Sequence, residues 1–215
     1  MKMNQRQYSF LDRVLSEVNR GINTLFSSPT AQRKNPAFEI IKDELSSADR
    51  QQSGRLMRIN HCGEVCAQAL YFGQLISASN PETLTMLKRA ADEESDHLAW
   101  TRQRLKELKT HPSYLNFAWY LNSFMIGLLA GLAGDKYSLG FVEETERQVS
   151  IHLSQHLKNI SNNDLKSKAI IEQMRADEEC HGRAANLAGA MPLPFIVTEI
   201  MKLQAKMMTS LTYWI

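Results

Sequence analysis

The chain lacks the features that mark several large classes of protein. Its three cysteines are an odd number, which gives no disulfide framework and favours a reducing compartment. The first ten residues are polar, so we expect no secretory signal and a cytoplasmic protein. A net charge of +2 is too small to indicate a nucleic-acid-binding protein, and no glycine-rich nucleotide-binding motif occurs. Because no run of residues alternates convincingly between polar and apolar, we expect no β-sheet.

What the chain does contain is typical of a helical, globular protein. Its 215 residues, 43% hydrophobic and 22% charged, suit one domain with a substantial core. Apolar residues recur at three- and four-residue spacing, and in the first predicted helix they are Phe10, Leu11, Val14, Leu15, Val18, Ile22 and Leu25. The sequence therefore predicts an all-α fold.

Turn and cap signals divide this single domain (1–215) into five parts. We predict an N-terminal helix and linker (1–50), a first helix pair (54–110), an apolar crossover segment (113–135), a second helix pair (137–190) and a C-terminal helix (195–215). The four helices of the two pairs run over about 54–77, 81–111, 137–160 and 165–189. Pro81 suits a first helical turn, and Asp164 ends a run of capping residues before the fourth of these helices.

Two copies of the motif Glu-x-x-His are the most informative feature of the chain. They are Glu94 to His97 and Glu178 to His181, and each follows a glutamate at a similar distance. Glu64 lies 30 residues before Glu94, and Glu146 lies 32 residues before Glu178. Helix positions i and i+3 share a face, so each motif directs one carboxylate and one imidazole to the same point.

Four carboxylates and two imidazoles from four helices suit a pair of metal ions in the core of a bundle. Without cations, four glutamates in a core would repel one another and lose their hydration. Two divalent cations would neutralise them. Carboxylates with one imidazole per ion suit iron or manganese, whereas structural zinc sites are richer in cysteine and histidine. We therefore expect two iron ions held by Glu64, Glu94, His97, Glu146, Glu178 and His181.

Other polar residues near these motifs have a structural as well as a functional interpretation. Glu93 and Asp177 each precede a motif histidine by four residues, and they either orient those imidazoles or lie in solvent. His152 is a candidate for a supporting role beside the metals, although a core or surface position is the default for it. A zinc site built from Cys62, Cys66 and Cys180 is disfavoured, because Cys180 and the adjacent His181 point in different directions on a helix.

The segment from Phe117 to Gly134 is uncharged over 18 residues, about 27 Å if it is wholly helical. That length is borderline for a membrane span. A single crossing would place His97 and Glu146, which must meet at one site, on opposite sides of the membrane. We therefore predict a crossover helix that packs on the bundle or lies in the membrane interface. A plain buried connection is the alternative.

Several strings in the chain resemble the signature of the demethoxyubiquinone hydroxylases, with the bacterial members most similar. They are LMRINHCGEVCAQALY (56–71), DEESDHLAW (92–100), GDKYSLGF (134–141), ETERQV (144–149) and QMRADEECH (173–181). The resemblance begins at Tyr8 and covers nearly the whole chain. It implies a ferritin-like four-helix bundle with the same six residues as iron ligands, of which Glu94 and Glu178 bridge the two ions.

The resemblance also implies a reaction, which is O2-dependent hydroxylation of the ring of a polyprenylated demethoxyubiquinol in ubiquinone biosynthesis. The electron donor is external, and NADH and the quinol itself are candidates. The implied location is peripheral, on the cytoplasmic side of the cell membrane. Other ubiquinone-biosynthesis proteins and a second copy of the chain are candidate partners, and nucleic acid is not. The rival hypotheses are a ferritin-like iron oxidase or storage protein and a non-enzymatic, membrane-associated helical bundle.

Overall fold

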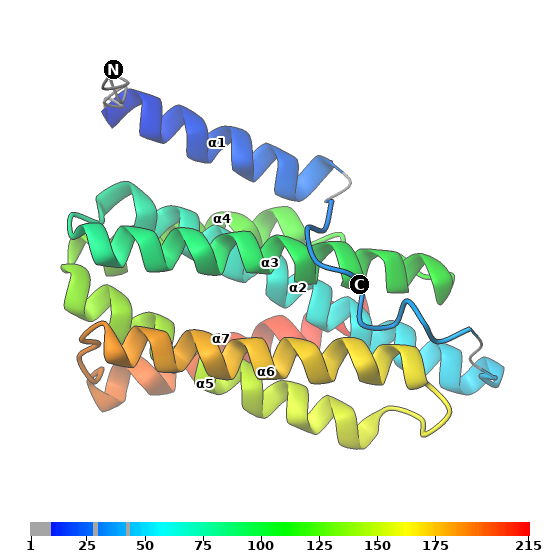
Figure 1. Cartoon of the computed structure of the whole chain (residues 1–215). Coiled ribbons are helices and arrows are strands. Elements are labelled where there is room, and N and C mark those ends of the chain that lie inside the picture. The colour runs from blue at the N-terminus through cyan, green and yellow to red at the C-terminus, as the bar shows by residue number, and fades with distance from the viewer. Residues whose placement is uncertain (1–9, 28–29, 42–43) are drawn as a thin grey trace.

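A computed structural model describes residues 10–27, 30–41 and 44–215. Within these ranges the chain forms seven α-helices and no β-strand, which confirms the all-α prediction (Figure 1). The helices are α1 (Phe10–Phe26), α2 (Ser47–Ser77), α3 (Pro81–Glu107), α4 (Asn116–Leu132), α5 (Asp135–Asn159), α6 (Leu165–Leu187) and α7 (Phe195–Thr212). Tyr8, at which the family resemblance begins, lies outside the described residues.

Three helices, α2, α3 and α6, begin after a residue whose side chain caps the helix. Asn80 caps α3 ahead of Pro81, and the Asp164 side chain accepts a hydrogen bond from the Ser167 backbone N–H at 2.9 Å at the start of α6. The predicted start of α2 near residue 54 was wrong. The helix begins seven residues earlier, at Ser47, and Ser46 caps it. The added turns are polar, so they give no apolar periodicity from which the helix could be predicted.

α2 is the central helix of the structure. It packs mainly against α4 and α3 and also contacts α1, α5 and α7, while α5 packs along α6. In the view of Figure 1, α3 and α6 lie nearest the reader, and α4 and α7 lie behind them. The four helices that carry the Glu/His motifs and their upstream glutamates, α2, α3, α5 and α6, therefore lie next to one another.

Two apolar clusters fill the interior at opposite ends of these four helices. The first contains Leu56, Met57, Trp100, Leu105, Leu153, Ile170, Ile171 and Met174. The second contains Tyr71, Phe72, Leu75, Leu87, Ala90, Leu139, Val142 and Ala185. In every one of the four helices, the predicted metal ligands fall between the residues of one cluster and those of the other. The ligands thus occupy a polar layer between two apolar layers.

α4, the predicted crossover helix, lies directly on α2. A Cβ atom added to Gly127 would overlap the carbonyl oxygen of Leu70, and one added to Gly73 would overlap the backbone of Phe124. Glycine at these positions therefore permits the close approach of the two backbones. The outer side of α4 remains apolar and exposed at Phe117, Leu121, Met125, Leu129 and Leu132. No helix of the described residues is long and apolar enough to cross a membrane.

Candidate metal centre

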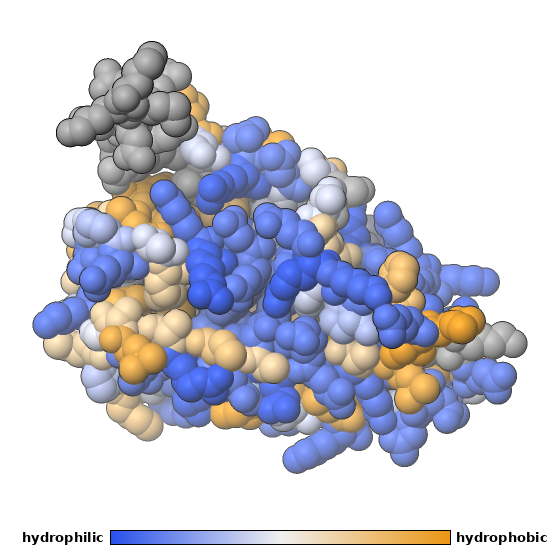
Figure 2. Space-filling model, viewed as in Figure 1, coloured by the Kyte–Doolittle hydropathy of each residue, from blue (hydrophilic) through white to orange (hydrophobic). Residues whose placement is uncertain are grey.

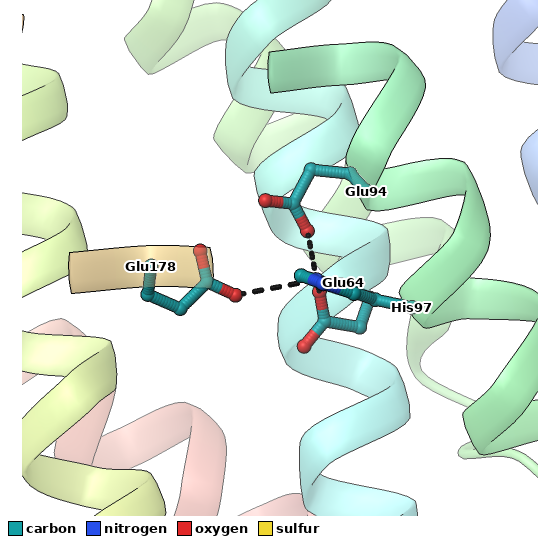
Figure 3. Close-up of side chains that lie close together, drawn as sticks. All are labelled: Glu64, Glu94, His97 and Glu178. Carbon is teal, nitrogen blue, oxygen red and sulfur yellow. Dashed lines mark hydrogen bonds and ion pairs between the residues drawn. The ribbon is translucent and has the colours of Figure 1, made fainter. Parts of the chain in front are cut away.

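The six predicted ligands converge from four helices. Glu64 comes from α2, Glu94 and His97 from α3, Glu146 from α5, and Glu178 and His181 from α6. They form two groups, in each of which one ligand atom per residue lies within 4.8 Å of the others. The groups are Glu64, Glu94, His97 and Glu178, drawn in Figure 3, and Glu94, Glu146, Glu178 and His181. Glu94 and Glu178 belong to both groups, so each can contact two ions.

Both imidazoles direct Nδ1 into the polar layer. His97 Nδ1 lies 3.2 Å from Glu94, 3.3 Å from Glu178 and 3.5 Å from Glu64 (Figure 3). His181 Nδ1 lies 3.2 Å from Glu178 and 3.4 Å from Glu94. None of the six ligand candidates is more than 6% exposed. The donor atoms therefore face one another in the interior of the protein.

The outer nitrogen of each imidazole contacts a carboxylate from the opposite helix. His97 Nε2 lies 2.9 Å from Asp177 on α6, and His181 Nε2 lies 2.8 Å from Glu93 on α3. Sequence reasoning picked these two carboxylates but paired each with the histidine of its own helix, which was wrong. α3 and α6 run antiparallel and face each other, and this arrangement exchanges the two pairs. Such contacts fix the ring so that Nδ1 presents its lone pair to a metal.

Arg33, in the linker before α2, supports the His97 side of the centre. Its guanidinium lies 2.7 Å from Asp96 and 2.9 Å from Asp177. Burial raises the pKa of Asp177, but hydrogen bonds with His97 and Arg33 outweigh burial and lower that pKa to about 2. Asp177 is therefore a stable anion beside His97. Nothing in the sequence of the linker indicated this contact, which joins residues more than 140 positions apart.

The electrostatics of the polar layer favour bound cations. Burial and the charge of Glu94 raise the pKa of Glu64, and burial with the charges of Glu178 and Glu94 raises the pKa of Glu146. Burial alone would lower the pKa of His181, but the surrounding carboxylates raise it to about 12. One oxygen of Glu94 is buried without a hydrogen-bond partner among the described residues. Oxygen-rich, buried and anionic, this donor set fits divalent ions that prefer hard ligands.

Comparison with known proteins gives the family. Residues 51–212 match the family model described as ubiquinone biosynthesis protein COQ7. The chain belongs to this family. It is also similar over its whole length to proteins named 3-demethoxyubiquinol 3-hydroxylase. The one from Coxiella burnetii (strain RSA 331 / Henzerling II) is 54% identical over 215 residues, all of both chains. The one from Xanthomonas euvesicatoria pv. vesicatoria (strain 85-10) is 48% identical over 208 residues, 97% of this chain and 96% of the relative. These findings confirm the resemblance.

Tyr71 is a further residue of this COQ7-family centre that sequence reasoning did not single out. Its side chain is completely buried on α2, and its hydroxyl donates a hydrogen bond to Glu146. Burial and the charge of Glu146 raise the pKa of the Tyr71 hydroxyl, so it remains protonated. Tyr71 follows Glu64 by seven residues, which is two helical turns on the same face of α2. This spacing is the only signal in the sequence that could have found it.

His152, the other candidate from the sequence, lies on α5 against a second histidine. The rings of His152 and His156 are 3.9 Å apart between centroids, and Nδ1 of His156 contacts Asn60 at 2.7 Å. Nε2 of His152 is buried without a hydrogen-bond partner among the described residues. A role beside the metals stays a prediction for His152. No group of potential metal ligands in the described residues includes a cysteine.

An apolar cavity lies beside the metal centre of this COQ7-family protein. It has about 720 Å³ of space not filled by protein atoms, part of it open to solvent. Its walls come from α2 (Gly63, Cys66, Ala67, Leu70), α4 (Trp119, Ser123, Ile126), α5 (Phe141, Thr145, Gln148) and α7 (Met201, Gln204, Ala205, Met208). Gly63 and Thr145 directly precede the ligand candidates Glu64 and Glu146 in sequence, although neither glutamate lines the cavity itself.

A second hollow, the polar groove, reaches the centre from between α5 and α6. Glu146 and Glu178 themselves line it, together with Glu143, Arg147, Glu179 and Gly182. Its charged walls suit water and small polar species. The centre thus has an apolar approach on the side of α4 and α7 and a polar approach between α5 and α6.

Proposed function

We propose that this protein is a 3-demethoxyubiquinol 3-hydroxylase that works with two iron ions and O2. The reaction places one oxygen atom of O2 on the ring of a polyprenylated quinol and releases the other as water, which consumes two electrons from a donor. One observation carries the proposal. A chain of the COQ7 family gathers two buried Glu/His groups that share Glu94 and Glu178.

The proposed ligands are Glu64, Glu94, His97 and Glu178 for one iron and Glu94, Glu146, Glu178 and His181 for the other. When bound, the iron pair supplies the activation of O2. The protein holds the ligands in place, because Asp177 and Glu93 accept the outer imidazole N–H groups and Tyr71 donates to Glu146. α2, α3, α5 and α6 would then form a ferritin-like bundle within a single domain, with α1, α4 and α7 added to it.

The apolar surfaces support a lipid substrate. α7 exposes Ile196, Ile200, Leu203, Met207 and Leu211 at helical spacing, and α4 exposes the apolar residues of its outer side. Figure 2 shows the other side, over α3 and α6, where hydrophilic side chains predominate. The apolar cavity is walled by α4 and α7, so a prenylated quinol could pass from a membrane to the metals. We therefore propose peripheral docking on the cytoplasmic side of the cell membrane.

The candidates for the electron donor and the protein partners are proposed from the reaction, not from a surface of the molecule. NADH and the quinol itself remain the candidates for the donor. Other ubiquinone-biosynthesis proteins and a second copy of the chain remain candidate partners. An iron-storage protein with the same ligands would need a polar exterior for cage assembly, and the exposed apolar residues of α4 and α7 argue against it.

A pair of neighbouring glutamates tests the proposal. Glu178 is buried in the centre, whereas the side chain of Glu179 is 41% exposed and pairs with Arg175. Each is replaced by alanine, the protein is loaded with Fe(II) without oxygen, and bound iron and quinol hydroxylation are measured. We expect Glu178→Ala to bind less than about half the wild-type iron and to lose hydroxylation with its helix content retained.

The variant Glu179→Ala is the matched control and should behave like the wild type. A strain that lacks the gene should accumulate the demethoxy-quinone, and Glu64→Ala should fail to restore the product. Full activity in Glu178→Ala, or restoration by Glu64→Ala, would contradict the proposed function.

A further inference from the structure

The glycines inside helices of this protein differ in the space that a Cβ atom would find beside them. Five of them pack so closely on a neighbouring element that a Cβ atom would collide with it: Gly21, Gly73, Gly127, Gly131 and Gly140. Gly54 and Gly182 would meet atoms at 3.2 Å and 3.5 Å. Gly63 is different, because no atom other than those of its chain neighbours and the backbone of its own helix lies within 4 Å of the position that its Cβ would occupy. Close packing therefore does not account for glycine at position 63.

Helix stability does not account for it either. Gly63 lies in the middle of α2, where glycine destabilises a helix relative to alanine. The backbone there is ordinary helix, and only Gly134 and Gly189 among the ten glycines have positive φ. Alanine would fit without collision and would stabilise the helix. The reason for a missing side chain at this point must therefore lie in what the empty space holds.

That space belongs to the apolar cavity and lies on α2, the helix that carries Glu64. Gly63 lines the cavity and precedes the ligand candidate Glu64, and Ala67 lines it on the face that Glu64 occupies, three residues further on. From α5, Thr145 contributes to the same wall and precedes Glu146. On α2, the small residues Gly63, Cys66 and Ala67 form the cavity wall close to Glu64 in sequence, whereas Trp119, Met201 and Met208 form walls on α4 and α7.

We propose that the missing side chain at Gly63 provides the space in which the aromatic ring of the quinol lies beside Glu64. Gly63 is then a residue that determines substrate specificity, since it decides how large a ring can approach the metals. The prenyl chain extends between α4 and α7, where the cavity walls are apolar. This inference rests on the proposed function, because it takes a prenylated quinol as the substrate.

The test compares Gly63→Ala and Gly63→Leu with Gly182→Ala. Gly182 is a matched control: it also lies within a helix, adjoins a ligand candidate, His181, and accepts a Cβ, but it borders the polar groove. Two probes are titrated into iron-free protein. Binding is followed by the quenching of tryptophan fluorescence, or by the ability of a probe that does not quench to displace one that does. The first probe is demethoxyubiquinone with two isoprene units, and the second is farnesol, which has an isoprenoid chain but no ring.

We expect Gly63→Ala to raise the melting temperature by about 2–4 °C, since alanine favours the helix. The same variant should bind the quinone at least about tenfold more weakly, and Gly63→Leu should not bind it measurably. Farnesol should bind both variants as it binds the wild type. With iron loaded, the KM for the quinol should rise in Gly63→Ala while the iron content stays unchanged.

Three results would overturn the inference. Equal quinone binding by Gly63→Leu and the wild type would show that no ring lies at position 63. Loss of farnesol binding together with quinone binding would show that the cavity has collapsed, or that the prenyl chain, not the ring, occupies this place. If only Gly182→Ala bound the quinone more weakly, the quinone would reach the metal centre through the polar groove instead of the apolar cavity. Wild-type protein that neither binds nor hydroxylates the quinone would instead overturn the proposed function, so the two failures are distinguishable.

Discussion

Each imidazole of the metal centre contacts carboxylates at both ring nitrogens. Nδ1 faces the ligand glutamates, and Nε2 contacts one carboxylate outside the ligand set, which we call the outer carboxylate. The outer partners differ in their surroundings. Asp177 contacts Arg33 at 2.9 Å from the linker, whereas Glu93 contacts Arg89 at 2.9 Å on its own helix. The two proposed iron sites therefore have the same ligand types but unequal support. The His97 side depends on a segment far away in sequence.

Neutralising an outer carboxylate should weaken metal binding without unfolding the protein. Asp177→Asn keeps the side-chain shape but removes the charge that Arg33 and the His97 ring contact. We expect Fe(II) affinity to fall about 10- to 100-fold, and Glu93→Gln should act similarly on the His181 side. Competition with a coloured chelator measures the affinity. Asp92→Asn, on the exposed surface next to Glu93, is the control, and an unchanged affinity in Asp177→Asn would contradict this role.

Two buried histidines and one partly buried histidine make the fold sensitive to acid. Burial lowers the pKa of His61 to about 3 and that of His152 to about 4, and burial with the charge of His152 lowers the pKa of His156 to about 3. In the unfolded chain these groups titrate near 6.5. As the pH falls below 6.5, the unfolded state takes up protons that the folded state does not, so the free energy of unfolding decreases.

Replacing one of these histidines should reduce that pH dependence. Each contributes up to about 1.4 kcal/mol per pH unit between pH 6 and pH 4.5. His156→Gln retains a side chain that can hydrogen-bond Asn60 but cannot be protonated. We expect the free energy of unfolding, measured with urea, to decrease less per pH unit on acidification in this variant than in the wild type. The difference in slope should be up to about 1.4 kcal/mol per pH unit. A variant with the wild-type slope would show that His156 is not neutral in the folded protein.

At the scale of elements, α4 and α7 have the same arrangement. Each has an apolar outer side, and each also lines the apolar cavity. Ile200 and Leu203 on α7 are 59% and 69% exposed. Such exposed apolar surface on two helices is unfavourable in water and favours contact with a lipid interface. The proposed docking thus depends on α7 as much as on α4, the only helix whose sequence had indicated membrane contact.

Charged residues on α7 should weaken vesicle binding. The double variant Ile200→Glu, Leu203→Glu should bind anionic phospholipid vesicles at least about tenfold more weakly in a sedimentation assay. It should still bind iron, because neither residue lines the apolar cavity or the metal centre. Leu165→Glu, at an exposed apolar position at the start of α6, is the control. Equal binding by the double variant and the control would exclude α7 from the docking surface.

At the scale of the whole molecule, the polar layer is the part of the core whose charges need neutralising. It places four carboxylates between two apolar clusters, and the helices that supply them, α2, α3, α5 and α6, meet there. Without metal, these groups need protons or contacts with imidazoles in place of cations. Metal binding should therefore contribute to the stability of the entire fold rather than to one segment.

The melting temperature should report this contribution. At a free Fe(II) concentration of about 100 times Kd, each bound ion adds about 2.7 kcal/mol, which raises the melting temperature by roughly 5–10 °C per ion. Thermal unfolding without oxygen, with and without Fe(II), measures the shift. Glu178→Ala should lose most of the shift, and Glu179→Ala should retain it. A shift of equal size in both variants would place the stabilising metal outside the proposed centre.

Much of this protein could be predicted from local sequence patterns. The periodicity of apolar residues and the boundary residues Pro81 and Asp164 predicted the helices, because helix formation depends on neighbours within one or two turns. The Glu-x-x-His spacing likewise aligned two donors on one face of a helix. The start of α2 was missed where its first turns are polar. Length and composition could not place α7 against the cavity, since that contact is long-range.

The sequence by itself determined which residues could hold metal, because a spacing of three along a helix fixes the relative direction of two side chains. Only the tertiary structure decided which partners support them. The antiparallel packing of α3 and α6 pairs His97 with Asp177 and His181 with Glu93, and the linker brings Arg33 to the same place. Gly63 shows the same division, since its identity is visible in the sequence but the empty space beside it exists only once four helices enclose it.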